Sequence, residues 1–293
     1  MTEVVLIGAS GWFGGHIRDR MRDLITVPAQ AVLASGGEVL RPLLDGADRA
    51  IVNAAGARTG TPDTLQRLNV DLPDILAQQV ARLGGHLVHL GSAAEYGTAQ
   101  PGGTCAEDAV PAPESDYGRT KLAGSLRVLD QGRATVLRIF NVAACPPQPG
   151  SPLADIAERV RSAIASGTDV ELLSAGTVRD WVRLAYVCDS IAYAARQRPT
   201  GVFNICSGVG VQMGDAVRTA VALLGSPAGV RDLEVFPPTA VVGSPDLWSE
   251  TSQMSEPLTV GGLAAILQAA VTGCATDDSD GGGGAGGRLG ARS

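Results

Sequence analysis

Short apolar runs alternate with longer amphipathic segments through the first half of the chain. The apolar runs predict five strands, at Val4 to Ile7, Leu24 to Val27, Arg49 to Val52, His86 to Leu90 and Ala134 to Arg138. The segments between them repeat apolar residues every three or four positions, which predicts helices at about Trp12 to Arg22, Pro62 to Arg82 and Asp116 to Asp130. This alternation predicts an α/β fold with a doubly wound parallel sheet that carries helices on both faces.

The second half is less regular and predicts a smaller C-terminal lobe interleaved with the last elements of the sheet. Its patterns favour helices near Pro152 to Ser166, Val187 to Gln197, Gln212 to Leu224 and Thr259 to Val271, and short strands near Val170 to Leu172 and Val202 to Ile205. We expect residues 1–145 and 182–206 to form the sheet domain, and residues 146–181 and 207–273 to form the lobe. Residues 274–293 are rich in Asp, Ser and Gly and bury too little apolar surface to order, which predicts a disordered tail.

A surplus of acidic residues limits the partners that the protein could have. The 293 residues include 30 acidic and 23 basic ones and no basic cluster with aromatic residues, so nucleic acid is not an expected partner. No apolar stretch has bilayer-spanning length and no signal-like segment precedes the first strand, so we expect a cytoplasmic protein without a membrane partner. The five cysteines are scattered, and metal-ligand spacing is absent among them and the three histidines, which predicts no disulfide framework and no metal site.

A glycine-rich loop joins the first predicted strand to the first predicted helix. It consists of Gly8, Ala9, Ser10, Gly11, Trp12, Phe13 and Gly14, with the GxxGxxG spacing. Glycines permit a tight turn and a close backbone approach, and the helix N-terminus that follows presents free N–H groups to a pyrophosphate. In this context the loop predicts dinucleotide binding by a Rossmann-type sheet, whereas a purely structural turn is the alternative.

The end of the second predicted strand does not distinguish NAD from NADP. An acid that holds the ribose 2′-hydroxyl is expected there, but the chain has Val27, Pro28, Ala29 and Gln30, with no adjacent arginine for a 2′-phosphate. Both cofactors therefore stay open. The stretch from Gln30 to Asp48 is also too short for a further strand and helix, which predicts a reduced adenine side of the site.

Tyr117 and Lys121 form a candidate catalytic pair. They stand four residues apart in a predicted helix that Ser115 or Asp116 caps, so they share one helix face. There the ammonium could lower the pKa of the phenol and also reach a cofactor ribose. Lys121 is the only lysine of the chain, which makes a chance pairing the weaker explanation. The alternative is a solvated lysine beside a half-buried tyrosine.

Ser92 is the third candidate catalytic residue. It follows the apolar strand that begins at His86, and ligands of open parallel sheets bind at the carboxyl ends of strands. Its hydroxyl could bind a substrate oxygen while Tyr117 exchanges the proton. A serine that merely forms the turn is the alternative. No GxSxG elbow occurs, and none of the three histidines is placed for a serine-nucleophile triad, so we interpret them as packed or surface residues.

The chain resembles the extended short-chain dehydrogenase/reductase family, and within it the nucleotide-sugar epimerases, dehydratases and 4-ketoreductases. The resemblance covers about residues 3 to 210. Its motifs are, in order, GASGWFG at Gly8 to Gly14, NAAG at Asn53 to Gly56, LNV at Leu68 to Val70, GSAAEYG at Gly91 to Gly97, YGRTK at Tyr117 to Lys121, LRIFNVAA at Leu137 to Ala144, and VRDWV at Val178 to Val182. It implies NAD or NADP as cofactor, a nucleotide sugar as substrate and, as a further expectation, a homodimer.

The resemblance also implies roles for single residues outside the catalytic group. The implied cofactor contacts beyond the glycine loop are those of Asn53, Ala54, Ala55 and Asn69. Asn141 and Arg179 are implied to contact the substrate, the forked guanidinium clamping its diphosphate. An ordinary ion pair is the alternative for Arg179.

One departure from the family pattern narrows the implied reaction. Sugar 4,6-dehydratases carry an Asp-Glu pair just after the serine position, where this chain has Ala93 and Ala94. With dehydration disfavoured, the resemblance implies hydride transfer at a single carbon of the sugar. The composition, poor in lysine and rich in alanine and arginine, resembles that of a high-GC bacterium. We therefore expect reduction of a 4-keto-6-deoxyhexose nucleotide in deoxysugar and antibiotic biosynthesis, with a 4-epimerase and a non-catalytic dinucleotide-sensing regulator as alternatives.

Overall fold

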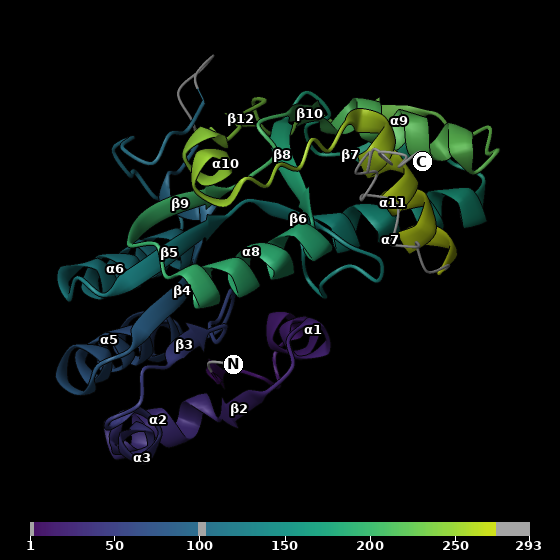
Figure 1. Cartoon of the computed structure of the whole chain (residues 1–293). Helices are drawn as coiled ribbons and strands as arrows, with labels where there is room; N and C mark the ends of the chain where they lie inside the picture. The colour runs from purple at the N-terminus through teal and green to yellow at the C-terminus, as the bar shows by residue number, and fades with distance from the viewer. Residues whose placement is uncertain (1–2, 99–103, 274–293) are drawn as a thin grey trace, which may run out of the picture.

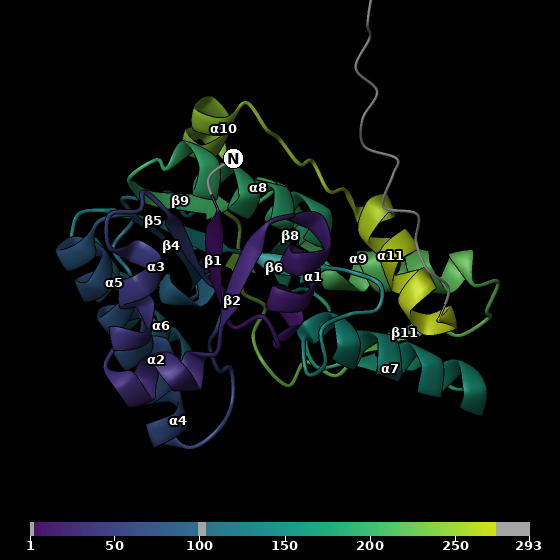
Figure 2. The ribbon, with the colours of Figure 1, turned by 60° about the horizontal axis from the view of Figure 1, so that its bottom comes forward.

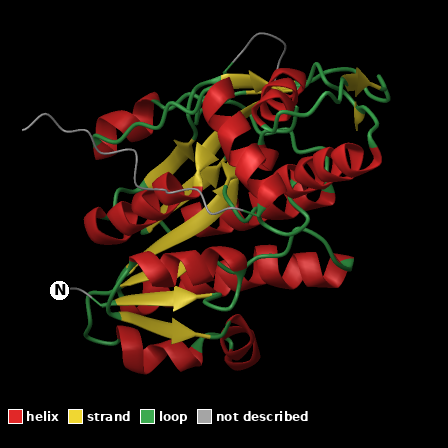
Figure 3. Ribbon diagram, turned by 90° about the vertical axis from the view of Figure 1, so that its right-hand side faces the viewer, coloured by secondary structure: helices red, strands yellow, loops and turns green. Residues whose placement is uncertain are grey.

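Six parallel strands form the central sheet of the computed structural model, which describes residues 3–98 and 104–273. They are β1 (Val4–Ile7), β2 (Leu24–Val27), β3 (Ala50–Asn53), β4 (His86–Ser92), β5 (Ala134–Ile139) and β9 (Gly201–Ile205). Their order across the sheet is β2-β1-β3-β4-β5-β9, and every neighbouring pair is parallel. The predicted α/β fold with a doubly wound parallel sheet is confirmed, and Figure 3 shows its strands with helices on either side.

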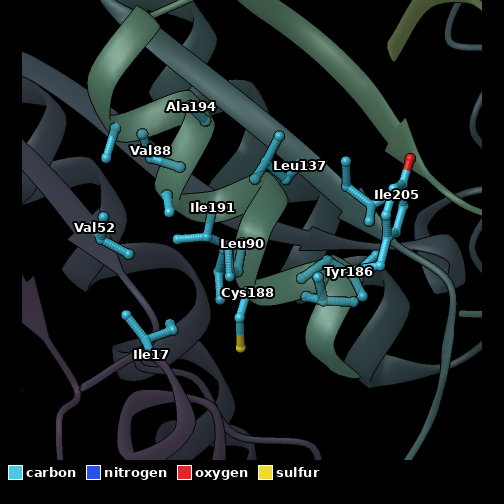
Figure 4. Close-up of a cluster of buried hydrophobic side chains, with 14 of the residues drawn as sticks. Ile17, Val52, Val88, Leu90, Leu137, Tyr186, Cys188, Ile191, Ala194 and Ile205 are labelled. Atoms are coloured by element: carbon cyan, nitrogen blue, oxygen red, sulfur yellow. The ribbon is translucent and has the colours of Figure 1, made fainter. Parts of the chain in front are cut away.

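Alternating side chains of the strands enter two separate cores, one on each face of the sheet. Val4 and Leu6 of β1 belong to the core under α1 (Trp12–Arg20) and α8 (Leu184–Gln197), where Ile17 and Ile191 meet them. Figure 4 shows this core, with side chains of α8 lying against those of the strands. Because both faces are buried, the strands read as continuous apolar runs.

The opposite face of the sheet is covered by helices that come from the first half of the chain. These helices are α2 (Ala29–Ser35), α3 (Arg41–Leu44), α5 (Leu72–Leu83) and α6 (Asp116–Asp130). Val5 and Ile7 of β1 pack there against Val32, Leu76 and Val128. Figures 1 and 2 show α1 and α8 apart from α2, α3, α5 and α6, with the strands between the two groups.

The segment between β2 and β3 contains helices and no strand, as its length predicted. It holds α2, a short 3-10 turn η1 (Glu38–Leu40) and α3, and the sheet therefore ends at β2. Among the described residues no further strand extends the sheet beyond β2, on the side where a dinucleotide's adenine is expected.

The helix predicted from Pro62 to Arg82 is wrong as a single element. It consists of α4 (Pro62–Gln66), a π-helical turn η2 (Arg67–Asp71) and α5. Pro73 has no N–H to give to the carbonyl of Asn69 four residues earlier, so the regular hydrogen bond is missing there. That carbonyl lies against α6, where a Cβ on Gly124 would come within 1.9 Å of it.

The smaller part of the protein is built around short strands and three helices. β8 (Val178–Arg183) pairs with β6 (Asn141–Ala143), β10 (Gly210–Gln212) and β12 (Ala240–Val241), and β7 (Val170–Leu172) pairs with β11 (Val230–Asp232). α7 (Pro152–Ser166), α9 (Met213–Leu223) and α11 (Val260–Thr272) lie together in Figure 1. Their buried side chains share a core with Trp181. α10 (Asp246–Ser252) packs instead against the sheet domain through Trp248.

Several sequence expectations concern features outside the core. None of the described helices combines the length and apolarity needed to cross a bilayer. The four cysteines within the described ranges form no disulfide, and no group of three metal-ligating side chains occurs there. Cys274 and the predicted disordered tail lie outside the described residues. The domain boundaries stay a prediction.

Candidate active site

A cavity of about 470 Å³ opens at the carboxyl ends of the central strands. It brings together residues from both halves of the chain, from the start of α1 to β8. The predicted site residues that line it are Gly11, Trp12, Phe13, Ala54, Ala55, Ser92, Tyr117, Lys121, Asn141 and Arg179. Residues proposed for cofactor, catalysis and substrate thus face one space, as the topology of an open parallel sheet requires.

Lys121 is buried at the base of this cavity. Its side chain is 4% exposed, and Nζ donates to the backbone carbonyl of Leu90. The imidazole Nε2 of His89 lies 3.5 Å from Nζ. Burial lowers the pKa of Lys121 to about 8, against a smaller raising effect of the Glu95 carboxylate. The alternative of a solvated lysine is therefore wrong.

Tyr117 lies one helical turn before Lys121 and is hydrogen-bonded to Ser92. Burial raises the pKa of Tyr117, and the hydrogen bond with Ser92 and the charge of Arg58 offset part of this rise. The expected lowering of this pKa by Lys121 does not appear. The Nζ of Lys121 is turned to Leu90, and the charge of Arg58 lowers the pKa of the phenol.

Ser115 starts the helix that carries this pair, as predicted. Its Oγ accepts a hydrogen bond from the backbone N–H of Gly118 over 3.0 Å. Gly118 must lack a side chain, because a Cβ there would lie 2.4 Å from the carbonyl of Ala94. The close approach brings the first turn of α6 against the segment that follows Ser92.

Ser92 is held by a reciprocal cap at the end of β4. Its Oγ accepts from the N–H of Ala94 over 3.2 Å, and its own N–H donates to Oε1 of Glu95 over 2.9 Å. Glu95 is fully buried, and its Oε2 accepts from Nε of Arg138 over 2.9 Å. Oε1 also accepts from the Ser125 hydroxyl. An ion pair without access to water thus fixes the backbone of Ser92.

The far wall of the cavity carries Asn141 and Arg179. Nδ2 of Asn141 donates to the carbonyl of Asp180 over 3.0 Å. The guanidinium of Arg179 donates to the carbonyls of Val178 and Thr239 and to the Thr239 hydroxyl. Burial lowers its pKa. Within the described part of the chain Arg179 has no carboxylate partner, so its charge is left for an anion in the cavity.

Five predicted cofactor residues do not line the cavity. They are Gly8, Ser10, Gly14, Asn53 and Asn69. Asn69 braces the loop after β3, because its side chain accepts from the N–H of Ala57 and donates to the carbonyl of the same residue. Asn53 is fully buried and turned to His89, with its Nδ2 3.1 Å from the imidazole Nδ1. Ser10 is exposed in the turn before α1.

Comparison with known proteins identifies the family. A model described as the NAD dependent epimerase/dehydratase family matches residues 4–206. The chain belongs to this family. The assignment confirms the predicted resemblance to extended short-chain dehydrogenases/reductases that act on nucleotide sugars, and it confirms a nicotinamide dinucleotide as cofactor.

Single relatives of the family share sequence or fold with this chain. The dTDP-6-deoxy-L-talose 4-dehydrogenase (NAD(P)(+)) of Kitasatospora kifunensis is 35% identical over 170 residues, 54% of this chain and 53% of the relative. The chain thus spans about half the length of that relative. Two solved structures have the same fold. They are the dTDP-glucose 4,6-dehydratase of Bacillus anthracis with NAD (TM-score 0.75, 18% identity, 92% and 96% of the two chains) and RMD of Pseudomonas aeruginosa with NADPH (0.76, 21%, 92% and 99%).

The glycine loop of this family member fits a dinucleotide. Gly8 has a φ of +87°, and a Cβ on it would lie 2.6 Å from the backbone nitrogen of Ala55. A Cβ on Gly14 would lie 2.0 Å from the carbonyl of Gly8. Gly11 begins α1 with no side-chain cap, and no acidic residue occupies the first turn. The helix N-terminus is therefore open to a phosphate.

Sequence reasoning missed three residues of the site, which are Arg58, His89 and Glu95. Arg58 lines the cavity, and the other two lie behind it. The expectation for His89 left open whether it packs or lies on the surface, and the ring is fully buried. A signal existed, because a polar residue inside an apolar central strand needs a buried partner. Glu95 lies after the strand, so this signal does not apply to it.

Proposed function

We propose that this protein reduces the keto group of a nucleotide-linked sugar, and specifically the 4-keto group of a 6-deoxyhexose nucleotide. The observation that carries the proposal is the hydrogen bond between Tyr117 and Ser92 in the cavity that the glycine loop also lines. A phenol and a second hydroxyl that meet at one point can bind a carbonyl oxygen together. Lys121 lies on the same helix face, where it can bind ribose hydroxyls.

Tyr117 and Ser92 have different roles in the reduction of a carbonyl group. A reduced nicotinamide held by the glycine loop and Lys121 would supply the hydride for the carbonyl carbon of the sugar. Tyr117 gives the proton of its Oη to the carbonyl oxygen, and Ser92 donates a hydrogen bond that orients this oxygen. The pKa of Tyr117 is raised by burial, so the phenol is protonated at neutral pH. A protonated phenol suits reduction, whereas oxidation of an alcohol first needs the phenolate.

The composition of the cavity disfavours dehydration. Ala93 and Ala94 follow Ser92 on the cavity wall, where acid and base groups would be needed to remove water from neighbouring carbons. Glu114 is the one carboxylate among the described lining residues, and it already accepts hydrogen bonds from Thr98. The cavity therefore suits hydride transfer at a single sugar carbon better than it suits dehydration.

The proposed substrate rests on Arg179 and on the name of the Kitasatospora relative. A partly buried guanidinium that has no carboxylate partner among the described residues, and that lines the cavity with Asn141, suits the diphosphate of a nucleotide sugar. The name of the Kitasatospora relative supplies the 4-position and the 6-deoxy sugar. A place in deoxysugar or antibiotic biosynthesis and a cytoplasmic location belong to the same proposal.

Turnover of defined keto sugars tests this function. The protein is mixed with dTDP- or UDP-linked 4-keto-6-deoxyhexoses and with NADH or NADPH, and the loss of the reduced-nicotinamide absorbance is followed with the formation of sugar product. We expect one cofactor oxidised for each alcohol formed. Interconversion of two sugar epimers without net cofactor oxidation would instead make the protein a 4-epimerase. Dinucleotide binding without any turnover would favour the regulator.

A further inference from the structure

Asn53, His89 and Lys121 form a continuous polar line behind the cavity. They come from β3, β4 and α6, and their side chains are 0%, 0% and 4% exposed. Nδ2 of Asn53 lies 3.1 Å from Nδ1 of His89, and Nε2 of the same ring lies 3.5 Å from Nζ of Lys121. Each group of the line therefore constrains the proton positions of the next.

The backbone of Ala55 fixes which way the Asn53 side chain points. Its N–H donates to Oδ1 of Asn53 over 3.2 Å, so the carboxamide NH₂ must face His89. An NH₂ group only donates, and Nδ1 of the ring must accept. Burial and the charge of Lys121 lower the pKa of His89 well below its ordinary value, so the ring is neutral and its one proton sits on Nε2.

The opposite tautomer leaves two donors face to face. A proton on Nδ1 of His89 would point at the Asn53 NH₂ across 3.1 Å. Turning the carboxamide over removes that conflict but places the NH₂ against the N–H of Ala55. An unsatisfied buried donor is destabilising, so both arrangements are disfavoured.

We infer that Asn53 and His89 are positioning residues that hold an imidazole N–H against Nζ of Lys121 and thereby favour its uncharged amine. The N–H presents its positive end to Nζ, which accepts this hydrogen as an amine and repels it as an ammonium. In the described part of the chain, the other ionisable groups around Lys121 are Glu95 on η3 (Ala93–Glu95), which favours the ammonium, and Tyr117 on α6.

This arrangement affects the protonation state of Lys121. Its pKa is lowered to about 8, so the side chain gains and loses a proton close to neutral pH. Without the N–H of His89, the ammonium would persist to higher pH and act only as a fixed charge. The inference rests on the proposed function only for the importance of Lys121, since the contacts themselves belong to the protein without ligands.

The single lysine makes the inference directly measurable. Protein labelled with ¹³C,¹⁵N-lysine gives one side-chain NMR signal, and its pH titration gives the pKa of Lys121 without cofactor or turnover. We expect His89→Phe to raise this pKa by about half a pH unit or more. Asn53→Leu should also raise it, because the imidazole can then turn its unprotonated nitrogen to Nζ. An unchanged or lowered pKa in His89→Phe overturns the inference.

A matched variant and a second measurement keep the test independent of folding. His86 lies on the same strand, is buried and contacts Thr135 instead of Lys121, so His86→Phe should leave the Lys121 pKa where it is. The ¹⁵N spectrum of the wild-type imidazoles should show Nδ1 of His89 without a proton, and a protonated Nδ1 overturns the inference with no variant at all. A failure to reduce keto sugars leaves both results unaffected, so the two proposals fail separately.

Discussion

The carboxylate of Glu95 accepts a hydrogen bond from the backbone N–H of Ser92 and at the same time pairs with Arg138. Both charged side chains are buried, at 0% and 4% exposure, so neither can turn to water. Arg138 also lies over the ring of Tyr96, with its guanidinium carbon 4.5 Å from the ring centroid. The position of a proposed catalytic serine thus depends on an ion pair outside the cavity.

Replacing Glu95 with glutamine should destabilise the protein markedly. Glu95→Gln keeps the shape but removes the carboxylate that pairs with buried Arg138, and breaking a buried ion pair costs about 3–5 kcal/mol. Urea denaturation followed by circular dichroism measures the change. Glu38 pairs with Arg41 and Arg82 at the surface, and Glu38→Gln is the control that should leave the midpoint nearly unchanged. Equal effects of the two variants would contradict this account of the ion pair.

Two neighbouring glycines of α1 should respond oppositely to alanine. A Cβ on Gly14 would lie 2.0 Å from the carbonyl of Gly8, whereas a Cβ on Gly15 meets no atom within 4 Å. Gly14→Ala must therefore push the glycine loop apart, and we expect dinucleotide affinity to fall about tenfold or more. Gly15→Ala should bind normally and gain about 0.5–1 kcal/mol of stability from helix propensity. Calorimetric titration with NAD and NADP measures the affinities, and normal binding by Gly14→Ala would count against the predicted loop contact.

Arg179 should determine affinity for the nucleotide sugar and leave cofactor affinity alone. Arg179→Gln retains hydrogen-bonding groups but loses the charge, so we expect KM for the sugar nucleotide to rise about tenfold or more. Steady-state kinetics with both substrates varied measures this. Arg218, which pairs with Asp215 on the surface of α9, offers Arg218→Gln as a control of equal charge change. A parallel rise of KM in both variants would show only a general electrostatic effect.

Stability should fall as the pH is lowered from about 6.5 towards 4, in part because of His86. Burial lowers the pKa of His86 from 6.5 to about 4, and its Nε2 lies 2.7 Å from the Thr135 hydroxyl. Within this window the unfolded chain binds a proton at His86 and the folded chain does not, so acid favours unfolding. His86→Gln cannot bind that proton and should show a shallower loss of unfolding free energy. Urea titrations at several pH values compare the slopes, and identical slopes would exclude the contribution of His86.

The central sheet could be predicted from the sequence because its strands are buried on both faces. β1 and β2 have the predicted limits, since an acidic residue precedes each apolar run and glycine or proline follows it. The strands of the smaller part were harder to predict from the sequence. β8 contains Arg179 and Asp180, whose polar character hides a strand, and Asp180 is buried only because Ser207, Gly208 and Gly243 donate to its carboxylate.

Sequence motifs predicted the site residues that belong to those motifs. They could not predict residues whose roles depend on tertiary contacts. Tyr117 and Lys121 stand out through their spacing. The π-helical turn packs the carbonyl of Asn69 against Gly124 of another helix, and the contact of His89 with Lys121 joins β4 to α6. Pro73 marks the interruption of the helix in the sequence, although the apolar periodicity continues past it. No local pattern records the contact of His89 with Lys121, so His89 was left without a role.

Substitution of Tyr117 by phenylalanine tests the central claim most directly. The proposal makes the phenolic Oη the donor of the proton, and Tyr117→Phe removes that atom while the ring still fills its place beside Ser92. We expect kcat for keto-sugar reduction to fall about 10²–10⁴-fold with little change in dinucleotide affinity. A Tyr117→Phe protein that binds cofactor and reduces the sugar at the wild-type rate would contradict the account.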